Sequence, residues 1–132
     1  MLTKREIAKK YIEYLSIGDV EKIINLFAAN GKVSSPIYGE KPAGLFYKEL
    51  IEDTINSSLQ LKGIFEEVDS NHIALYFEYT WTVKSGKMVQ FDVVDILDFD
   101  EDNKIIKLKI IYDTVISRKL VQEMKASKKS PE

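Results

Sequence analysis

The chain has 132 residues, of which 45% are hydrophobic, and this length fits one domain with a sizeable core. Its formal net charge of −2 argues against a broad phosphate-binding surface, so we expect no nucleic-acid partner. The absence of cysteine excludes disulfides, thiolate metal sites and cysteine nucleophiles.

The first expected element is a helix over residues 4–16. Thr3 and Glu6 have the spacing of a capping box, and apolar residues then recur at helical spacing. Gly18 is typical of a helix end, and Asp19 is a good cap for the next helix. We therefore predict that the chain begins with a helical hairpin.

The second helix is expected to continue to about residue 30, because its apolar stripe includes Phe27. A short strand over residues 32–35 and a Pro-rich loop should follow. A third helix is predicted over residues 43–58. Its inward positions are expected to be Phe46, Leu50, Ile51, Thr54 and Ile55.

From residue 60 onward the apolar period changes to two, with three turn-like breaks, which predicts four antiparallel strands. On the second of these strands one face is strongly apolar: Ile73, Leu75, Phe77, Tyr79, Trp81 and Val83. On the last strand the expected inward residues are Ile106, Leu108, Ile110 and Tyr112. The outer face is partly apolar: Val94, Ile96, Ile105 and Ile111. This mixed face predicts a homodimer.

Helices followed by an antiparallel sheet predict an α+β fold. We expect a cone-shaped α+β roll, with three N-terminal helices packed on a curved, mostly antiparallel sheet. The open end of the cone should form a pocket. Aromatic side chains are available to wall it: Tyr14, Tyr38, Tyr47, Tyr79, Phe46, Phe77 and Trp81. A final helix is expected within residues 117–126.

Residues 117–132 carry five Lys or Arg against two Glu, unlike the rest of the chain. We predict a main domain over residues 1–116 and a basic C-terminal helix or tail over residues 117–132. No apolar segment approaches the roughly 18 residues of a membrane-spanning helix, and residues 1–10 lack the apolar core of a signal peptide. We therefore expect a cytoplasmic protein with no membrane partner.

One carboxylate interrupts the apolar pattern of the strand over residues 88–99. Counting by twos, Asp95 shares a face with two Phe, two Val and a Leu. A carboxyl group in such surroundings must be paired, stay protonated or face a cavity. Tyr11 lies on the inward stripe of the first helix, and a neutral carboxylic acid beside a phenol can hold an enolate or phenolate oxygen. Alternatively, Asp95 and Tyr11 satisfy one another or water without any ligand.

The chain resembles the nuclear transport factor 2-like superfamily, specifically ketosteroid isomerases and SnoaL-like polyketide cyclases. Two stretches carry the resemblance. YIEYLSIGDVEKIINLFAANGKVSSPIYGE, from residue 11, looks like the family's first helix, Gly-Asp turn, second helix and Val-x-x-Pro loop. VVDILDFDEDNKIIKLKIIYD, from residue 93, looks like the last two strands of the family. The resemblance covers residues 4–113 and implies the cone fold.

The resemblance also implies roles for individual residues. Tyr11 and Asp95 fall on the two positions that form the family's oxyanion hole, and Tyr112 falls on a pocket-lining Phe. The family's general base, an Asp before the loop proline, is replaced by Ser35 here. A Ser hydroxyl cannot take a proton from carbon unless another base activates it. Glu40, in the nearby loop, is the candidate replacement.

Other titratable residues are weaker candidates for a base, because strand alternation points them outward: His72, Asp92 and Asp113. We predict a domain that binds a small apolar or aromatic ligand, without metal or organic cofactor. Tyr11 and Asp95 would be catalytic in an isomerase, cyclase or lyase acting on a carbonyl or phenolic compound. The expected substrate-binding residues are Ser35, Tyr14, Phe46, Phe77, Tyr79, Phe91 and Tyr112. The alternatives are a non-catalytic binding module and a protein-interaction dimer.

Overall fold

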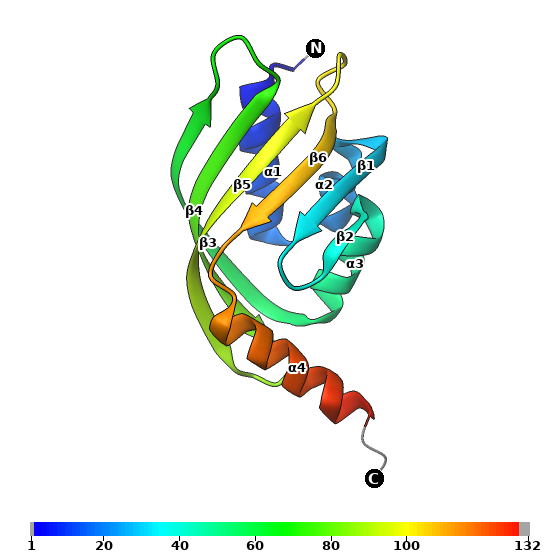
Figure 1. Ribbon diagram of the computed structural model, residues 1–132, viewed down its shortest axis with the longest axis vertical. Coiled ribbons are helices and arrows are strands. Elements are labelled where there is room, and N and C mark those ends of the chain that lie inside the picture. Colours follow the sequence, from blue (N-terminus) through cyan, green and yellow to red (C-terminus); the bar gives the residue numbers. More distant parts are fainter. Residues whose placement is uncertain (1, 130–132) are drawn as a thin grey trace.

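A computed structural model describes residues 2–129 of the chain, with side chains described as far as residue 126. Three helices, α1 (Lys4–Ile17), α2 (Val20–Asn25) and α3 (Ala43–Glu52), cover one face of a six-stranded sheet (Figure 1). The strands are β1 (Phe27–Ser35), β2 (Gly39–Pro42), β3 (Thr54–Glu66), β4 (His72–Val83), β5 (Met88–Phe99) and β6 (Ile105–Ile111). The predicted α+β fold is confirmed.

The sheet has the order β2-β1-β6-β5-β4-β3, and only the pair formed by β1 and β6 is parallel. The last four strands therefore form the predicted antiparallel meander. They curve around the helices, as Figure 1 shows. β5 has a hydrogen-bonded neighbour on each side, β4 and β6, and its inward side chains Val93, Asp95 and Leu97 are buried.

The start and end of α1 follow the predicted capping signals. The Thr3 side chain accepts a hydrogen bond from the Glu6 backbone amide, and the Glu6 side chain accepts one from the Thr3 amide. Gly18 ends the helix with a φ of 72°, in the left-handed region that glycine adopts readily. The Asp19 side chain then caps α2 by accepting a hydrogen bond from the amide of Lys22.

The predicted extension of α2 to residue 30 is wrong, because this helix ends at Asn25. The carbonyl of Leu26 accepts a hydrogen bond of 3.0 Å from the amide of Ile105, and Phe27 pairs with Ile105 across the parallel strands. Pairing with β6, a strand far along the chain, therefore overrides the local helical pattern.

The predicted extension of α3 to residue 58 is also wrong. The helix ends at Glu52, and β3 begins at Thr54, whose hydroxyl donates to the carbonyl of Leu50. Two of the positions predicted to face inward, Ile51 and Ile55, are 44% and 57% exposed. This apolar segment could be read as a helix or a strand, and pairing with β4 decides it.

The inward face of β4 is buried at every predicted position. On β6 the predicted alternation fails at its start, because the pairing with β5 shifts between Asp98 and Phe99. Ile105 is consequently fully buried, and Ile106 is 37% exposed. Ile111 remains exposed on the outer face, where the homodimer stays a prediction.

The C-terminal helix α4 (Val115–Lys129) crosses the end of the sheet opposite the N-terminus (Figure 1). Its apolar side chains Leu120, Val121 and Met124 are buried, which agrees with the helix predicted there. The division of the chain at residue 117 stays a prediction. Among the described residues, no helix combines the length and apolar character needed to cross a membrane.

Gly31 in β1 offers a test of the fold, because the register of β1 against β6 shifts between Phe27 and Lys32. A Cβ on Gly31 would lie 2.9 Å from the carbonyl oxygen of Ile105. Gly31→Ala should therefore lower the free energy of unfolding by about 1–3 kcal/mol, as overpacking does. Urea denaturation measures this change. Gly44→Ala, in α3, is the matched control.

At Gly44 the nearest atom to a new Cβ is 3.9 Å away, which is an ordinary contact. We expect Gly44→Ala to leave stability unchanged or to raise it by up to about 1 kcal/mol. Equal effects of the two substitutions would contradict the close approach of β1 and β6 at Gly31.

Candidate functional site

A cavity of about 60 Å³ lies between the helices α1 and α3 and the concave face of the sheet. Its lining is aromatic apart from a few residues: Tyr11, Leu15, Ser35, Tyr38, Phe46, Tyr47, Leu50, Phe77, Tyr79, Trp81, Phe91, Val93, Asp95, Ile110 and Tyr112. The structure thus brings together Tyr11, Asp95 and all but one of the predicted substrate-binding residues. Tyr14 and Glu40 do not line the cavity.

Asp95 is the polar centre of this cavity. It is 1% exposed, and it lies on β5 opposite Leu75 of β4 and Ile110 of β6. Burial raises the pKa of its carboxyl group well above the ordinary value, and hydrogen bonding with Tyr11 lowers the pKa by less. The group is therefore a neutral carboxylic acid over a wide range above its ordinary pKa.

One oxygen of this carboxyl group, Oδ1, has no hydrogen-bond partner among the described residues. Buried polar atoms are nearly always paired, so an unpaired one beside a cavity is where a ligand atom would bind. A hydrogen bond between the Asp95 carboxyl group and the Tyr11 hydroxyl would still leave Oδ1 without a partner among the described residues.

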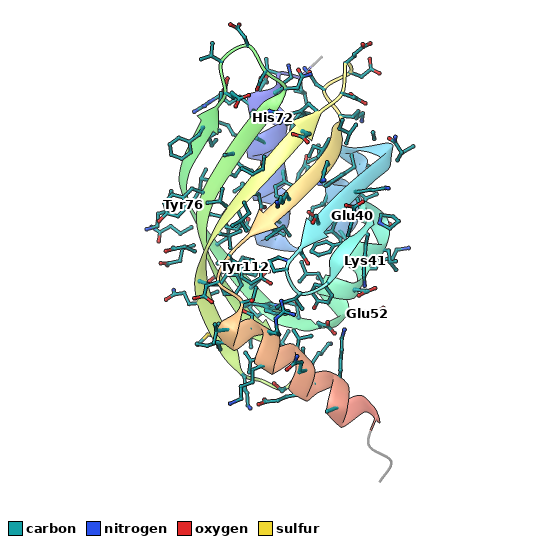
Figure 2. The ribbon with its side chains drawn as sticks, viewed as in Figure 1. Glu40, Lys41, Glu52, His72, Tyr76 and Tyr112 are labelled. Atoms are coloured by element: carbon teal, nitrogen blue, oxygen red, sulfur yellow. The ribbon has the colours of Figure 1, made fainter. Side chains whose placement is uncertain are left out.

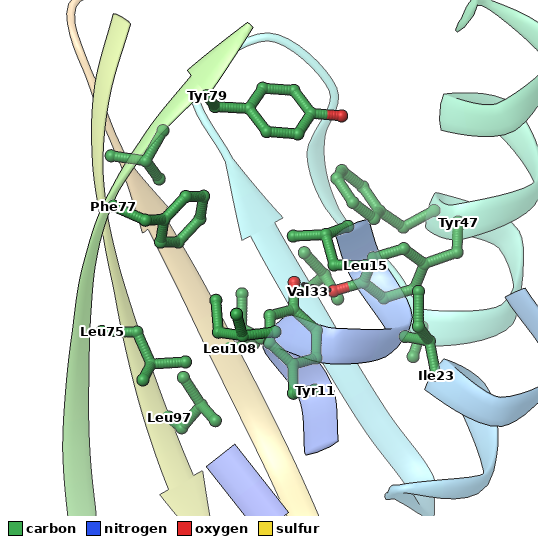
Figure 3. Packing of buried hydrophobic residues seen from close by; sticks show 14 of the residues in the cluster. Tyr11, Leu15, Ile23, Val33, Tyr47, Leu75, Phe77, Tyr79, Leu97 and Leu108 are labelled. Atoms are coloured by element: carbon green, nitrogen blue, oxygen red, sulfur yellow. Dashed lines mark hydrogen bonds between the residues drawn. The ribbon is translucent and has the colours of Figure 1, made fainter. Parts of the chain in front are cut away.

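Tyr11 extends the polar centre toward α3. Its hydroxyl lies 2.7 Å from the hydroxyl of Tyr47, and the two rings meet edge to face at 6.3 Å (Figure 3). Both side chains are at most 2% exposed, and burial raises the pKa of both phenols. They are therefore protonated, and Tyr47 fixes where the Tyr11 hydroxyl lies.

Ser35 closes one side of the cavity at the end of β1. Its Oγ accepts a hydrogen bond of 2.9 Å from the backbone amide of Tyr38, in the turn between β1 and β2. The hydroxyl hydrogen of Ser35 is consequently directed away from this amide. Ser35 is a polar residue of the cavity lining, in which the one carboxyl group is that of the neutral Asp95.

The other candidate bases lie away from the cavity. Glu40 is exposed on β2, where its carboxylate is 3.7 Å from the ammonium of Lys32. Figure 2 shows Glu40 on this edge strand and His72 near the N-terminal end of the sheet. Asp92 is exposed on the outer face of β5, and Asp113 accepts a hydrogen bond from a backbone amide near the start of α4. His72 and Asp92 have the outward strand positions that the alternation predicted, whereas Asp113 lies beyond the end of β6 and Glu40 lies on β2.

The side chain of His72 lies between two carboxylates, near the N-terminal end of the sheet. Its Nε2 is 2.7 Å from Asp98, and its Nδ1 is 3.3 Å from Glu67. The outward direction predicted for His72 is what the structure shows. Across the described residues, no group of three or more His, Asp or Glu is arranged to hold a metal ion.

Paired aromatic rings form part of the cavity wall. Phe91 and Tyr112 stack at 4.5 Å with an angle of 17° between their planes. Burial raises the pKa of Tyr112 to about 12. On the opposite side, the Tyr38 hydroxyl donates a 2.6 Å hydrogen bond to Asp53, which fixes the loop after β1 to the end of α3. Every phenol in the lining with a shifted pKa is therefore a neutral group at pH 7.

No protein-family model matches the chain. Solved structures with a similar fold include an NTF2-like protein of unknown function from Burkholderia pseudomallei K96243, at 14% identity and a TM-score of 0.79, which covers 91% of this chain and 98% of that one. TerC co-crystallised with polyporic acid matches at 16% identity and a TM-score of 0.75, over 90% and 98% of the two chains.

A putative isomerase from Bacillus subtilis also matches, at 14% identity and a TM-score of 0.74, over 89% of this chain and 94% of that one. A further similar structure, a hypothetical protein from Catenulispora acidiphila DSM 44928, is described as having a ketosteroid isomerase-like fold. At these identities the likeness concerns the fold alone. The chain has the NTF2-like fold, as its resemblance to this superfamily predicted.

The neutral state of Asp95 has a consequence for stability. Because its pKa is raised in the folded chain, the unfolded chain ionises this group first as the pH rises above about 3.8. The stabilisation by protonated Asp95 is complete below that pH and is lost progressively as the pH approaches the folded pKa. We expect a slope of about 1.4 kcal/mol per pH unit over this interval.

Asp95→Asn should lack this contribution. Urea denaturation of the wild type and of the variant from pH 4 upward measures the difference in unfolding free energy at each pH. We expect the unfolding free energy of the variant, relative to that of the wild type, to rise steadily with pH. A difference independent of pH would mean that Asp95 ionises normally in the folded chain.

Proposed function

We propose that this chain is a small-molecule-binding domain that holds an oxygen of a carbonyl or phenolic compound between Tyr11 and Asp95. The observation that carries the proposal is the unpaired, buried Oδ1 of Asp95 at the wall of an aromatic cavity. A neutral carboxylic acid beside a phenol offers two hydrogen-bond donors to one oxygen. The surrounding rings would pack against the apolar body of the ligand.

Binding without catalysis is favoured over proton abstraction by the composition of the cavity. Asp95 is the only carboxyl group among its lining residues, and burial keeps that group protonated. A general base must reach the proton that it removes, and Ser35 supplies no base at the position where similar enzymes carry one. The similarly folded TerC, co-crystallised with polyporic acid, supports a small organic ligand for this fold.

Isomerase, cyclase or lyase chemistry through an enolate-like intermediate is the second candidate function. It is favoured by the same pair, Tyr11 and Asp95, because donors that hold a carbonyl oxygen also stabilise the enolate formed from it. The putative isomerase from Bacillus subtilis, similar in fold, agrees with this class. The base would then have to come from the ligand or from a residue that moves.

The binding proposal is tested with 2-naphthol, a fluorescent phenol, titrated into the wild type and two variants. Tyr11→Phe and Asp95→Asn should each weaken binding about 10- to 100-fold, because each loses or degrades one buried hydrogen bond to the phenol oxygen. Tyr14→Phe is the matched control, since Tyr14 lies one turn further along α1 and outside the cavity lining.

The Tyr14→Phe variant should bind 2-naphthol as tightly as the wild type. Equal affinity of the wild type and the two cavity variants would place the ligand elsewhere. Circular dichroism of each variant separates lost binding from lost folding.

The choice between binder and enzyme is tested by exchange of the α-protons of 2-tetralone in heavy water, followed by NMR. We expect the wild type not to accelerate exchange, because no base lines the cavity. Ser35→Asp should introduce one beside the held oxygen and accelerate exchange by about 10²- to 10⁴-fold, the usual contribution of a general base.

Ser34→Asp is the control for this substitution, because strand alternation points residue 34 away from the cavity. It should leave exchange at the rate of the free ketone. Acceleration by the wild type itself would establish the second candidate function.

A further inference from the structure

Strand β5 begins well before the point at which its neighbour β6 starts to pair with it. From Met88 to Val93, β5 pairs with β4 without a shift of register. Pairing with β6 begins only at Val94, which lies opposite Ile111, the last residue of β6. Figure 1 shows the hairpin of β4 and β5 continuing past the end of β6. Within the described residues, one edge of β5 is therefore open over this stretch.

Backbone hydrogen-bonding groups point out of this open edge. The amide of Val83 donates to the carbonyl of Lys87, so the carbonyl of Lys87 faces β4. Successive residues of a paired strand direct their backbone groups to alternate edges. The N–H and C=O groups of Gln90 and Asp92 consequently face the side on which β6 has ended. An extended chain that lies along this edge can therefore hydrogen-bond with both residues.

The other open edges of the sheet are less suited to an added strand. β3 lies at one end of the sheet, and its pairing with β4 shifts within residues 54–56 and again within residues 61–63. Such irregularities disrupt the hydrogen-bond ladder and protect an edge from further pairing. β2, at the opposite end, extends only from Gly39 to Pro42. The open part of β5 is longer than β2 and more regular than β3.

A groove of about 640 Å³ lies along this edge of β5. Its lining combines residues of β5 with residues that lead into α4: Val89, Gln90, Phe91, Asp92, Asp113, Val115 and Ile116. Val115 and Ile116 are 76% and 60% exposed, and Met88, at the start of the same edge, is 67% exposed. Exposed apolar side chains that gather in one place are typical of an interaction site. The groove therefore offers apolar contacts beside unpaired backbone groups.

The charge of the groove determines which kind of segment fits it. Its lining contains the carboxylates of Asp92 and Asp113 and, among the described residues, no Lys or Arg. Glu78, which lies opposite Asp92 on β4, adds a third carboxylate. Side chains alternate along β5, so Phe91 points inward and Asp92 points outward. Because neighbouring strands place side chains of one face side by side, a basic residue fits beside Asp92 and an apolar one beside Phe91.

We infer that this groove binds an extended segment of a partner protein, in which basic residues alternate with apolar ones, as an added strand beside β5. The segment lies where β6 would continue, with its basic side chains near Asp92 and Asp113. Backbone hydrogen bonds give an added strand its affinity, and its alternate side chains give specificity. The inference is independent of the proposed function, because it concerns the open edge of β5 and not the cavity.

The probe for this groove is the peptide acetyl-KVKVKV-amide, titrated into the isotope-labelled wild type and followed by NMR. We expect the largest changes of amide shift at residues 88–93 and 113–116. Acetyl-KKKVVV-amide has the same composition without the alternation, and acetyl-EVEVEV-amide has the opposite charge. Both should bind at least about tenfold more weakly. Shift changes that are absent, or that lie elsewhere, would overturn the inference.

The backbone contact is tested by Gln90→Pro. This substitution removes the N–H that faces the open edge and leaves the bonds between β5 and β4 in place. It should weaken binding of acetyl-KVKVKV-amide about tenfold, the usual effect of losing one hydrogen bond. Gln90→Ala is the matched control, because it keeps the N–H and should bind as tightly as the wild type. Equal affinities of the two variants contradict pairing through the backbone.

Charge reversal gives a second test, since a proline can also disturb the strand itself. Asp92→Lys, at an exposed position, should weaken binding of acetyl-KVKVKV-amide and strengthen binding of acetyl-EVEVEV-amide, each about tenfold. Glu101→Lys, in the turn after β5, is the matched control and should leave both affinities unchanged. If Asp92→Lys changes neither affinity, the groove does not select basic segments and the inference is wrong.

A second copy of the chain is the other possible occupant of this edge. NMR spectra of the wild type alone, recorded over a range of chain concentrations, distinguish it from a partner segment. We expect the amides of residues 88–93 to keep their shifts at every concentration. Shifts of these amides that grow with chain concentration, together with failure of the peptide to bind, would assign the edge to self-association and overturn the inferred partner.

Discussion

The carboxyl group of Asp95 is buried on the inward face of β5, between β4 and β6, and the rest of the site depends on that burial. A charged carboxylate there would lose its hydration without gaining a cationic partner, so the group keeps its proton instead. Retaining the proton turns an acceptor of hydrogen bonds into a donor. In the proposed function, Tyr11 and Asp95 would then both donate to an oxygen that a ligand brings.

The alternation of apolar residues was enough to predict the sheet and to find Asp95, because a single carboxylate on an apolar face stands out at period two. Helix ends were predicted well where a local cap decides them, as at Thr3 and Gly18. They were predicted badly where a distant strand decides them, as at Phe27 and Thr54. The residues near these helix ends do not indicate which distant strand will pair with them.

In the candidate site, too, the features set by local sequence could be predicted, and those set by distant contacts could not. Asp95 and Tyr11 could be identified from their own strand and helix, but the contact of Tyr11 with Tyr47 depends on how α1 packs against α3. Phe46 and Tyr47 are adjacent on α3 and both buried, so the helical period alone did not separate a wall residue from a hydrogen-bond partner. The contacts of α4 could not be predicted for a similar reason, since its hydrogen bonds join it to turns far apart in the chain.

The serine at position 35 bears on what the cavity would do to a bound molecule. Donors alone stabilise a negative oxygen but cannot create it, because creating it requires a base that removes a proton. In a largely apolar cavity the low local dielectric strengthens each hydrogen bond to a ligand oxygen. Without a base in the lining, these features support the proposed binding role over conversion of the ligand, and a fold of this kind accommodates either role.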